Sequence, residues 1–527
     1  MVSPAADLVL YNANVLTLDT TCPKGELIAI KDGRIVNIST NRALKEFTSK
    51  KTKVIDCHGK TVVPGFNDAH LHLLAFAESL LTLNLGLDSV RSISDIKNKI
   101  RRLSQNLPPG SWIRAGGYNE FYLEEKRHPT RWDLDQATTS HPVKLTHRSG
   151  HAHVLNSMAL ALTGISRETP EPPGGMIERD LDTGEPNGLL FGMDNYLARF
   201  IPPLSDTELT QGIKLANQEL LARGITSIQD ASPRNDLTRW RLFQQWKSQR
   251  LLSPRTTMLL GLEAFHQFPT LNSTPRIGGD HLQLGAVKIM IDETRGHLNP
   301  PQIELNQKVL TIHRSGFQVA FHAVEETTIE AACTALEYAL ANSPCSDHRH
   351  RIEHCSICPP KIVKRLASLN VIVVTQPSFI YYNGDRYLQT VSQDQLKYLY
   401  PMASLIKAGI KVAASSDCPV VPPDPPKGIY AAVSRMTQTG QSILPEERVS
   451  SLQALQLYTE SAAYACFQEN IKGTIAPGKL ADLVILNNDP TKMALEQTRK
   501  LEVEITIIGG EIAWSKPSNS GYKVPPP

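Results

Sequence analysis

Two histidines separated by one residue follow an apolar run near the N-terminus. Residues 62–72 read VVPGFNDAHLH, and the pair is His70 and His72. Because residues i and i+2 of an extended segment point to the same face, both imidazoles can reach one metal ion. A pair of surface histidines in a turn is the alternative, but the apolar run before the pair and the partners downstream favour a metal site.

Four more residues with metal-binding or acid–base side chains occur in or directly after apolar runs of strand length. They are Lys288 in LGAVKIMID, His322 in VAFHAVE, His354 in RIEHC and Asp417 in AASSDCPV. The strand ends of a (β/α)₈ barrel converge on one axis, so residues far apart in sequence can share one site. Imidazole and carboxylate ligands together suit zinc, manganese or iron(II).

Each of these four residues has a simpler interpretation when it is taken alone. A histidine after an apolar strand is often a hydrogen-bonded core residue, which applies to His322 and His354. Asp417 would serve as a helix N-cap or turn residue. Lys288 would extend its amine from an alternating strand to water. Their shared position at strand ends favours a common site instead.

Other histidines and cysteines are interpreted more conservatively. In the pair His151 and His153, His151 is expected to face the substrate, whereas the pair at 348 and 350 is interpreted as solvated surface. The eight cysteines are sparse and scattered, as in a protein with reduced thiols. Cys355 and Cys358 have C-x-x-C spacing, but without a second such motif they indicate two cysteines near a strand end rather than a zinc or redox site.

Composition excludes several classes of partner. The 55 basic and 52 acidic residues give a net charge of +3, so neither nucleic acid nor an anionic membrane surface is expected. No apolar run is long enough for a transmembrane helix, and the N-terminus lacks the pattern of a signal peptide. We expect a cytoplasmic enzyme with a small-molecule substrate, and a homodimer is one possible assembly.

The two ends of the chain carry strand patterns that predict one small domain. Residues 7–63 alternate short apolar runs with turns, including Asp32-Gly33, and predict an antiparallel sheet. A similar pattern returns in the C-terminal segment, with a tight turn at Gly509-Gly510. Residues 1–63 and 468–515 are therefore expected to form a composite β-sandwich, and residues 516–527 a disordered tail.

The middle of the chain alternates apolar strands with helical patterns, which predicts a parallel sheet with crossover helices. We expect an α/β fold in which residues 64–467 form a TIM-like (β/α)₈ barrel. Residues 80–200 break this rhythm and are interpreted as a large insertion after the first barrel strand, covering the mouth of the active site. The expected strands after the insertion are 226–230, 255–262, 284–292, 317–324, 349–356, 370–377 and 410–417.

At this point the sequence resembles the amidohydrolase superfamily, and more narrowly its family 3, the YtcJ-like branch that includes N-substituted formamide deformylases. The resemblance covers nearly the whole chain. It rests on PGFNDAHLH, GSWIRAGGYNE, RHPTRWDLD, SGHAHVLNSMAL, LGAVKIMID, RIEHCS, SSDCPVVPPDP and KGTIAPGKLADLVILNNDP.

The resemblance implies a role for each site residue. His70 and His72 would bind one metal ion, and His322 and His354 another. Lys288 matches a position that is carboxylated in many relatives and bridges two ions, and Asp417 matches the aspartate that orients and deprotonates water. The loops differ from those of relatives: Glu325-Glu326 stands where Gly-Asp is usual, and Asp292-Glu293 follows the fourth strand. Specificity is therefore not copied from relatives.

The expected activity is metal-dependent hydrolysis of a non-peptide C–N bond, in an amide or N-substituted formamide. One or two divalent ions, with zinc the first expectation, would activate water, and Asp417 would transfer its proton to the leaving nitrogen. Either His322 or a residue of the insertion would help to stabilise the oxyanion. His151, Trp112 and Asp292 are expected to contact the substrate. Two alternatives remain: a different reaction on the same metal barrel, such as decarboxylation, isomerisation or ester hydrolysis, and a metal-free binding scaffold.

Overall fold

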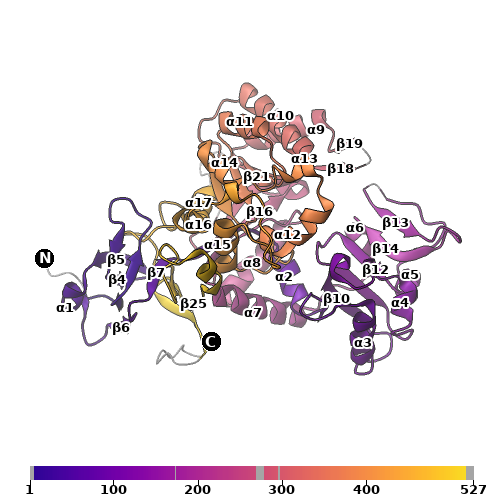
Figure 1. Cartoon of the computed structure of the whole chain (residues 1–527), viewed down its shortest axis with the longest axis horizontal. Coiled ribbons are helices and arrows are strands. Elements are labelled where there is room, and N and C mark those ends of the chain that lie inside the picture. Colours follow the sequence, from indigo (N-terminus) through magenta and orange to yellow (C-terminus); the bar gives the residue numbers. More distant parts are fainter. Residues whose placement is uncertain (1–4, 173, 269–277, 295–296, 518–527) are drawn as a thin grey trace. The chain divides into compact units, whose positions relative to one another are not determined.

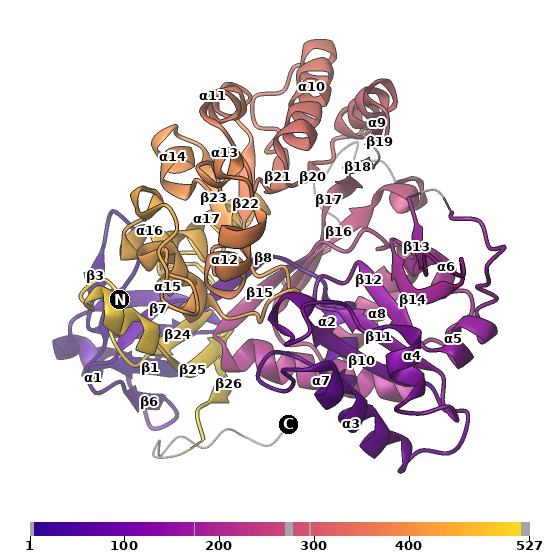
Figure 2. The same cartoon turned by 45° about the vertical axis from the view of Figure 1, so that its right-hand side comes forward.

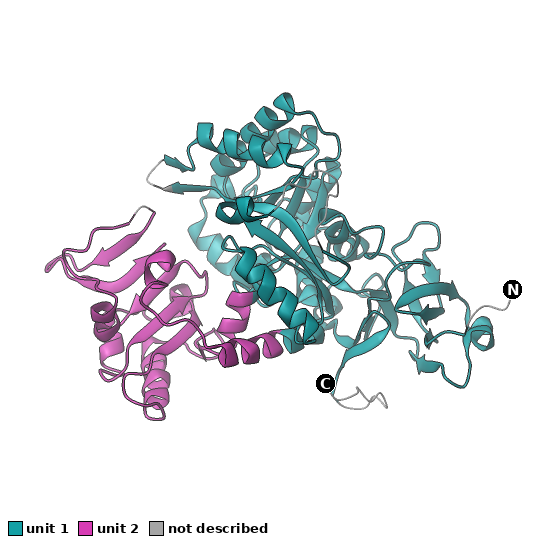
Figure 3. Cartoon of the chain, turned by 180° about the vertical axis from the view of Figure 1, so that it is seen from behind, with its two compact units in different colours: residues 1–73, 217–527 teal, residues 74–216 magenta. Residues whose placement is uncertain are grey.

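The computed structural model describes residues 5–172, 174–268, 278–294 and 297–517 (Figure 1). The chain divides into two compact units. Unit 1 comprises residues 1–73 and 217–527, and unit 2 comprises residues 74–216 (Figure 3). Among the described residues, no helix is both long and apolar enough to cross a membrane.

Unit 1 contains eight parallel strands in one sheet, in the order β23-β22-β21-β20-β17-β16-β15-β8. The predicted TIM-like barrel is confirmed, because each expected strand segment forms a strand. The strands are β8 (Phe66–Leu71), β15 (Ile225–Asp230), β16 (Arg255–Gly261), β17 (Leu282–Met290), β20 (Val319–Ala323), β21 (Arg351–His354), β22 (Ile372–Thr375) and β23 (Lys411–Ala414).

The first and last barrel strands meet through the residues that follow β23. The amide of Asp417 donates to the carbonyl of His70, and the amide of His72 donates to the carbonyl of Cys418, each at 2.8 Å. Leu71 and Cys418 form a parallel bridge between these segments. The seam of the barrel therefore runs through three of the predicted metal ligands.

Helices cover the outside of the strands. In Figure 2, α9 (Gln302–Arg314), α10 (Glu326–Asn342) and α11 (Pro360–Ser368) lie outside β17, β20 and β21. In α11, Ile362, Val363 and Leu366 are buried while its lysines are not. The remaining helical elements of the barrel are α7 (Asp206–Ala222), α8 (Leu237–Ser248), η3 (Leu262–Gln267), α12 (Ser378–Thr390), α13 (Gln393–Leu396), α14 (Met402–Lys407), α15 (Pro425–Ser434), η4 (Pro445–Glu447), α16 (Ser451–Leu457) and α17 (Glu460–Ala465).

Strands from both ends of the chain form two further sheets with a shared core. One sheet has the order β5-β4-β1-β6, and the other has the order β26-β25-β24-β7-β2-β3. Their common core joins Leu10 and Ile28 with Leu483 and Ile505. The strands are β1 (Leu8–Tyr11), β2 (Asn14–Leu16), β3 (Lys24–Gly25), β4 (Leu27–Lys31), β5 (Arg34–Ser39), β6 (Lys53–Asp56), β7 (Thr61–Pro64), β24 (Leu483–Leu486), β25 (Val503–Ile508) and β26 (Glu511–Ser515).

The expectation of a purely antiparallel N-terminal sheet is wrong. β1 pairs with β6 in parallel, and β2 pairs with β7 in parallel. The chain leaves β5 through η1 (Asn41–Ala43) and α1 (Leu44–Phe47) before β6 returns beside β1, and such a crossover brings a strand back in the same direction. Both predicted tight turns form hairpins: φ is positive at Asp32 and Gly33 and at Gly509 and Gly510, as a type I′ turn requires.

Unit 2 is an α/β unit with a six-stranded sheet in the order β13-β14-β12-β11-β10-β9. β9, β10 and β11 are parallel, whereas β12, β14 and β13 are antiparallel. A core that includes Ile96, Leu134 and Leu145 lies within this unit. Its elements are α2 (Leu73–Ser79), β9 (Leu83–Asn84), α3 (Ile93–Ser104), β10 (Ile113–Tyr118), η2 (Glu120–Tyr122), α4 (Arg131–Asp135), β11 (Val143–His147), β12 (Ala152–Leu155), α5 (Ser157–Leu162), β13 (Met176–Arg179), β14 (Pro186–Phe191) and α6 (Asp194–Leu197).

The predicted tail lies almost wholly outside the described residues, which end at residue 517. Lys516, at the start of that tail, forms an ion pair of 2.6 Å with Glu502. The helical turn η5 (Leu495–Lys500) lies between β24 and β25 and completes the C-terminal segment.

Candidate metal centre

Three of the predicted ligands lie close together at the end of the barrel where β8 meets the segment after β23. The Nε2 atoms of His72 and His70 lie 3.1 and 3.5 Å from Oδ1 of Asp417. One ligand atom from each residue lies within 4.8 Å of the other two. These residues therefore form a set of two imidazoles and one carboxylate that suits a divalent transition metal.

His354 and His322 continue this group of rings. The ring centroids of His70 and His354 are 5.0 Å apart, and those of His354 and His322 are 4.5 Å apart. His322 lies on β20 and His354 ends β21, so the barrel brings these residues together at the carboxyl ends of its strands.

The amine of Lys288 on β17 is buried without the polar partner that a buried amine normally has among the described residues. The side chain is only 1% exposed, and Nζ has no hydrogen-bond partner among the described residues. Burial lowers the pKa of Lys288 to about 8, against the opposing charges of Glu353 and Asp417. An unpaired buried amine is costly unless something else contacts it. The residues present therefore fit a metal-bearing site in which Lys288 has a further partner.

A buried ion pair between Arg351 and Glu353 lies on the Nδ1 side of the His70 ring. Oε2 of Glu353 lies 2.5 Å from Nδ1 of His70, and Arg351 donates to both oxygens of Glu353. Arg351 also donates to Gln229 and to the carbonyl of Ala69. A carboxylate that holds Nδ1 leaves Nε2 directed at the metal position, as in many metal sites. Sequence reasoning missed Glu353 and Arg351, although two charges within the apolar strand RIEHC were a usable signal.

Uncharged partners orient the imidazoles of His354 and His72. Nδ1 of His354 lies 3.0 Å from the side-chain oxygen of Gln376, and Nδ1 of His72 lies 3.3 Å from Oγ of Ser232. Because an amide oxygen only accepts, His354 donates from Nδ1 and keeps the Nε2 lone pair. Burial lowers the pKa of His354, and burial together with the charge of Lys288 lowers that of His70, so both rings are neutral and able to bind a metal.

The segment that carries Asp417 is fixed by Asp68 on β8. Asp68 accepts from the amide of Ser416 at 3.0 Å and from its hydroxyl at 2.5 Å. Burial would raise the pKa of Asp417, but the hydrogen bond from His72 and the neighbouring imidazoles of His354 and His70 lower it well below its usual value. His354 and Asp417 both have positive φ, a strained conformation that is concentrated at functional sites.

Comparison with known proteins places the chain in a family. A family model for amidohydrolases matches residues 53–513. The chain belongs to the amidohydrolase family. This amidohydrolase is 28% identical to an N-substituted formamide deformylase of Arthrobacter pascens, over 97% of the chain and 98% of that protein. It is 29% identical to the putative amidohydrolase YtcJ of Bacillus subtilis, over 93% of the chain and 96% of that protein.

A solved structure supports the fold of this amidohydrolase. An uncharacterised metal-dependent hydrolase from Pyrococcus horikoshii matches 93% of the chain and 99% of its own chain, with a TM-score of 0.73 and 23% identity. At that identity the match establishes the fold. The residues that carry chemistry in this amidohydrolase must therefore be argued from its own geometry.

The predicted substrate-binding residues of this amidohydrolase are divided between the two units. Trp112 and His151 belong to unit 2, whereas Asp292 belongs to unit 1. Trp112 packs partly buried against the core of unit 2, and His151 is exposed. Asp292 is an exposed residue at the start of β18 (Asp292–Thr294), which pairs with β19 (His297–Asn299). Their contact with a substrate stays a prediction.

The interpretation of His348 and His350 as solvated surface is wrong. Their exposed fractions are 7% and 1%. Nε2 of His350 lies 2.9 Å from Nδ1 of His313, and the amide of Val319 donates to Nδ1 of His350. The amide of His350 donates to Nδ1 of His348, whose Nε2 contacts the carbonyl of Leu369. The polar pattern looked exposed because these partners come from other elements.

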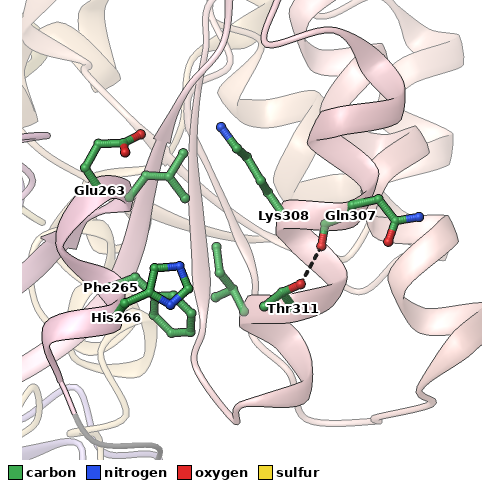
Figure 4. A pocket seen from close by; sticks show the side chains of 8 residues that line it. Glu263, Phe265, His266, Gln307, Lys308 and Thr311 are labelled. Carbon is green, nitrogen blue, oxygen red and sulfur yellow. Dashed lines mark hydrogen bonds between the residues drawn. The ribbon is translucent and has the colours of Figure 1, made fainter.

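A cavity of about 300 Å³ lies elsewhere in unit 1, between η3 and α9 (Figure 4). Phe265 and Ile312 provide apolar lining, while Glu263, His266 and Lys308 provide charged or titratable groups. None of the residues that line it belongs to the His70, His72 and Asp417 set. This cavity is therefore separate from the candidate metal centre.

Proposed function

We propose that this amidohydrolase hydrolyses a non-peptide C–N bond, in an amide or N-substituted formamide of a small organic molecule. The observation that carries the proposal is the convergence of His70, His72 and Asp417 beside the unpaired amine of Lys288. The name of the Arthrobacter relative, a formamide deformylase, supports the bond type. Family membership makes the chain a hydrolase, and the proposal adds the bond that it cleaves.

A divalent ion, with zinc as the first choice, fits this donor set. His70 and His72 would hold one ion, and His322 and His354 a second, with a carboxylated Lys288 between them and Asp417 beside the first. When bound, such an ion lowers the pKa of water from 15.7 to about 7 and polarises the scissile carbonyl.

The side chains of this chain supply the proton transfers. Asp417 is ionised at neutral pH because its neighbours lower its pKa, so it accepts a proton from the attacking water. The same carboxyl then delivers that proton to the departing nitrogen. With only the first ion bound, His322, which is half-buried on β20, would stabilise the developing oxyanion by donating a hydrogen bond. Glu353 holds His70 in place throughout.

The substitution Asp417→Asn tests the proposed proton transfer. We expect retained metal and a fall in turnover of about 10²- to 10⁴-fold on a panel of N-substituted formamides and amides, because the amide cannot accept the proton. Metal content by elemental analysis and release of amine plus acid are the two measurements. Asp394→Asn, at a solvent-exposed carboxyl that pairs with Lys397, is the matched control. Wild-type turnover in Asp417→Asn would eliminate this base.

A further inference from the structure

A second group of metal-binding side chains lies in unit 2, beyond the ends of its parallel strands. Tyr118 ends β10 and pairs with His147, which ends the neighbouring strand β11. Glu120 begins η2 directly after β10, and His128 lies between η2 and α4. Ligands of open α/β sheets bind outside the carboxyl ends of the strands, which is where these side chains gather.

Two imidazole nitrogens approach one carboxylate oxygen. Nε2 of His147 lies 2.9 Å from Oε2 of Glu120, and Nε2 of His128 lies 3.9 Å from the same oxygen. Two atoms bound to one tetrahedral zinc ion at about 2.1 Å lie about 3.4 Å apart, between these two separations. Nε2 of His147 and Oε2 of Glu120 are also buried, and neither makes a well-aligned hydrogen bond with any described residue.

Hydroxyl groups hold the opposite nitrogen of each ring. The hydroxyl of Tyr118 lies 3.0 Å from Nδ1 of His128, and Oγ of Ser149 lies 2.8 Å from Nδ1 of His147. In the metal-free state the Ser149 amide donates to Nδ1 of His147 and favours the tautomer with the proton on Nε2. Because a hydroxyl accepts as well as donates, Oγ of Ser149 can support the opposite tautomer, in which Nε2 carries the lone pair. This is the arrangement in which imidazoles bind metals, with the second nitrogen fixed by a neighbour. When a metal binds, the ring of His147 must carry its proton on Nδ1. The ring then donates to Oγ of Ser149 and loses its present contact, at 3.2 Å, with the Ser149 amide.

We propose that Glu120, His128 and His147 form a second transition-metal site, which takes a zinc-type divalent cation. Two histidines and one glutamate are a known zinc donor set that leaves one coordination position open. The side chains of Glu120, His128 and His147 are 28%, 22% and 14% exposed, so an ion can enter from solvent. His128 is the outermost ligand: the three donor atoms do not all lie within 4.8 Å of one another, so binding requires its ring to move inward. A bound ion links the segment after β10, the loop before α4 and the end of β11.

The site is tested in the full chain with the barrel ligands removed. In a His70→Ala/His72→Ala/His354→Ala variant, titration of metal-free protein with zinc alone is expected to show one tight equivalent. Adding Glu120→Gln or His147→Ala is expected to weaken that binding by about 100-fold or more, and Tyr118→Phe by about 10-fold. Glu168→Gln, an exposed carboxylate in unit 2, is the matched control and leaves zinc affinity unchanged.

A second measurement covers the case in which the triple variant fails to fold. In wild-type protein, hydrogen exchange with and without zinc is expected to show slower exchange over residues 118–128 and 147–149, and Glu120→Gln abolishes this effect. No zinc equivalent in the folded triple variant overturns the proposal, as does binding that both cluster variants leave intact. Failure here leaves the proposed barrel chemistry untouched, because Asp417→Asn tests that chemistry separately.

Discussion

The buried pair of Glu353 and Arg351 fixes a single atom of the candidate site. Glu353 is fully buried, and its charge is balanced mainly by Arg351, while one of its oxygens contacts Nδ1 of His70. A buried ion pair of this kind contributes little net stability, but removing one partner is strongly destabilising. Its value lies in setting which nitrogen of His70 faces Asp417.

Replacing Glu353 with Gln is expected to weaken metal binding by about 10- to 100-fold, because the amide is a poorer partner for His70 than a carboxylate. Zinc titration of metal-free protein measures the loss. Glu337→Gln, which removes a carboxylate from an exposed pair with Arg365, is the control. Equal zinc affinity in the two variants would assign Glu353 a purely structural role.

Lys288 is expected to cost stability rather than supply it. In metal-free protein, Lys288→Met removes a buried amine without a partner and keeps the length of the side chain, so the free energy of unfolding rises by about 1–3 kcal/mol at pH 7. Activity is lost in the same variant. Urea unfolding and turnover are the two measurements, and a less stable variant contradicts the argument.

The advantage of Lys288→Met must depend on pH in a defined direction. Burial lowers the pKa of Lys288 to about 8 in the fold, against 10.5 for an unperturbed lysine. The folded protein therefore resists protonating this amine, and the penalty is fully present below about pH 8. As the pH rises from about 8 to 10.5, the unfolded chain also loses the proton and the difference between variant and wild type shrinks. Urea unfolding across that range measures it.

At the scale of elements, buried histidines link α9, β20 and β21 at the end of the barrel opposite the metal centre. His313 lies on α9, and its partner His350 directly precedes β21. The amides of Val319 and His350 donate to Nδ1 of His350 and His348, so each of these two rings must carry a lone pair on Nδ1. Local sequence carries no sign of this, because the partners lie 37 residues apart.

The histidine network predicts a loss of stability in acid. Burial lowers the pKa of His350 well below 6.5 and also lowers that of His348, so the unfolded chain binds protons that the fold excludes. Stability therefore falls as the pH drops through about 6.5, by up to about 1.4 kcal/mol per pH unit for each histidine. His348→Asn is expected to reduce this slope, whereas His58→Asn, at an exposed histidine, leaves it unchanged. Urea unfolding from pH 7 to 5 decides between them.

Sequence patterns predicted strands and turns well and predicted pairing poorly. Barrel strands such as β17 and β22 were predictable because apolar, β-branched runs are typical of strands buried on both faces. Asp32-Gly33 was predictable because few residue pairs tolerate a type I′ turn. The parallel pairing of β1 with β6 was not, because alternation along a strand says which face is buried and nothing about the direction of its neighbour.

The residues of the candidate site were likewise predictable only in part. His70, His72 and Asp417 were identifiable because a metal ligand must be one of a few residue types at a strand end. Glu353 was not, since its role depends on contact with His70 across 283 residues of sequence. The cluster around Glu120 escaped for that reason too: Tyr118, Glu120 and His147 come together only when β10 pairs with β11.

At the scale of the whole molecule, each compact unit contains buried clusters of its own. Leu145 belongs to a core within unit 2, and Leu366 is fully buried on α11 in unit 1. Independent cores predict that unfolding is not a single two-state transition.

Core substitutions are expected to affect the two units separately. Leu145→Ala and Leu366→Ala each create a cavity that costs about 2–5 kcal/mol, so each lowers the melting temperature of its own unit. Differential scanning calorimetry of the full chain should show two transitions, with a different one shifted in each variant. A single transition that both variants shift equally would show that the units unfold together.

The hydrogen bonds that join His70 and His72 to Asp417 and Cys418 also have a consequence in time. The ribosome synthesises the first strand of the barrel early and the segment after the last strand late. His70 and His72 are therefore synthesised long before Asp417, which completes the set of ligands. A nascent or prematurely terminated chain cannot assemble the complete set of ligands. A metal can therefore bind to the complete set only at the end of biosynthesis, after the barrel has closed.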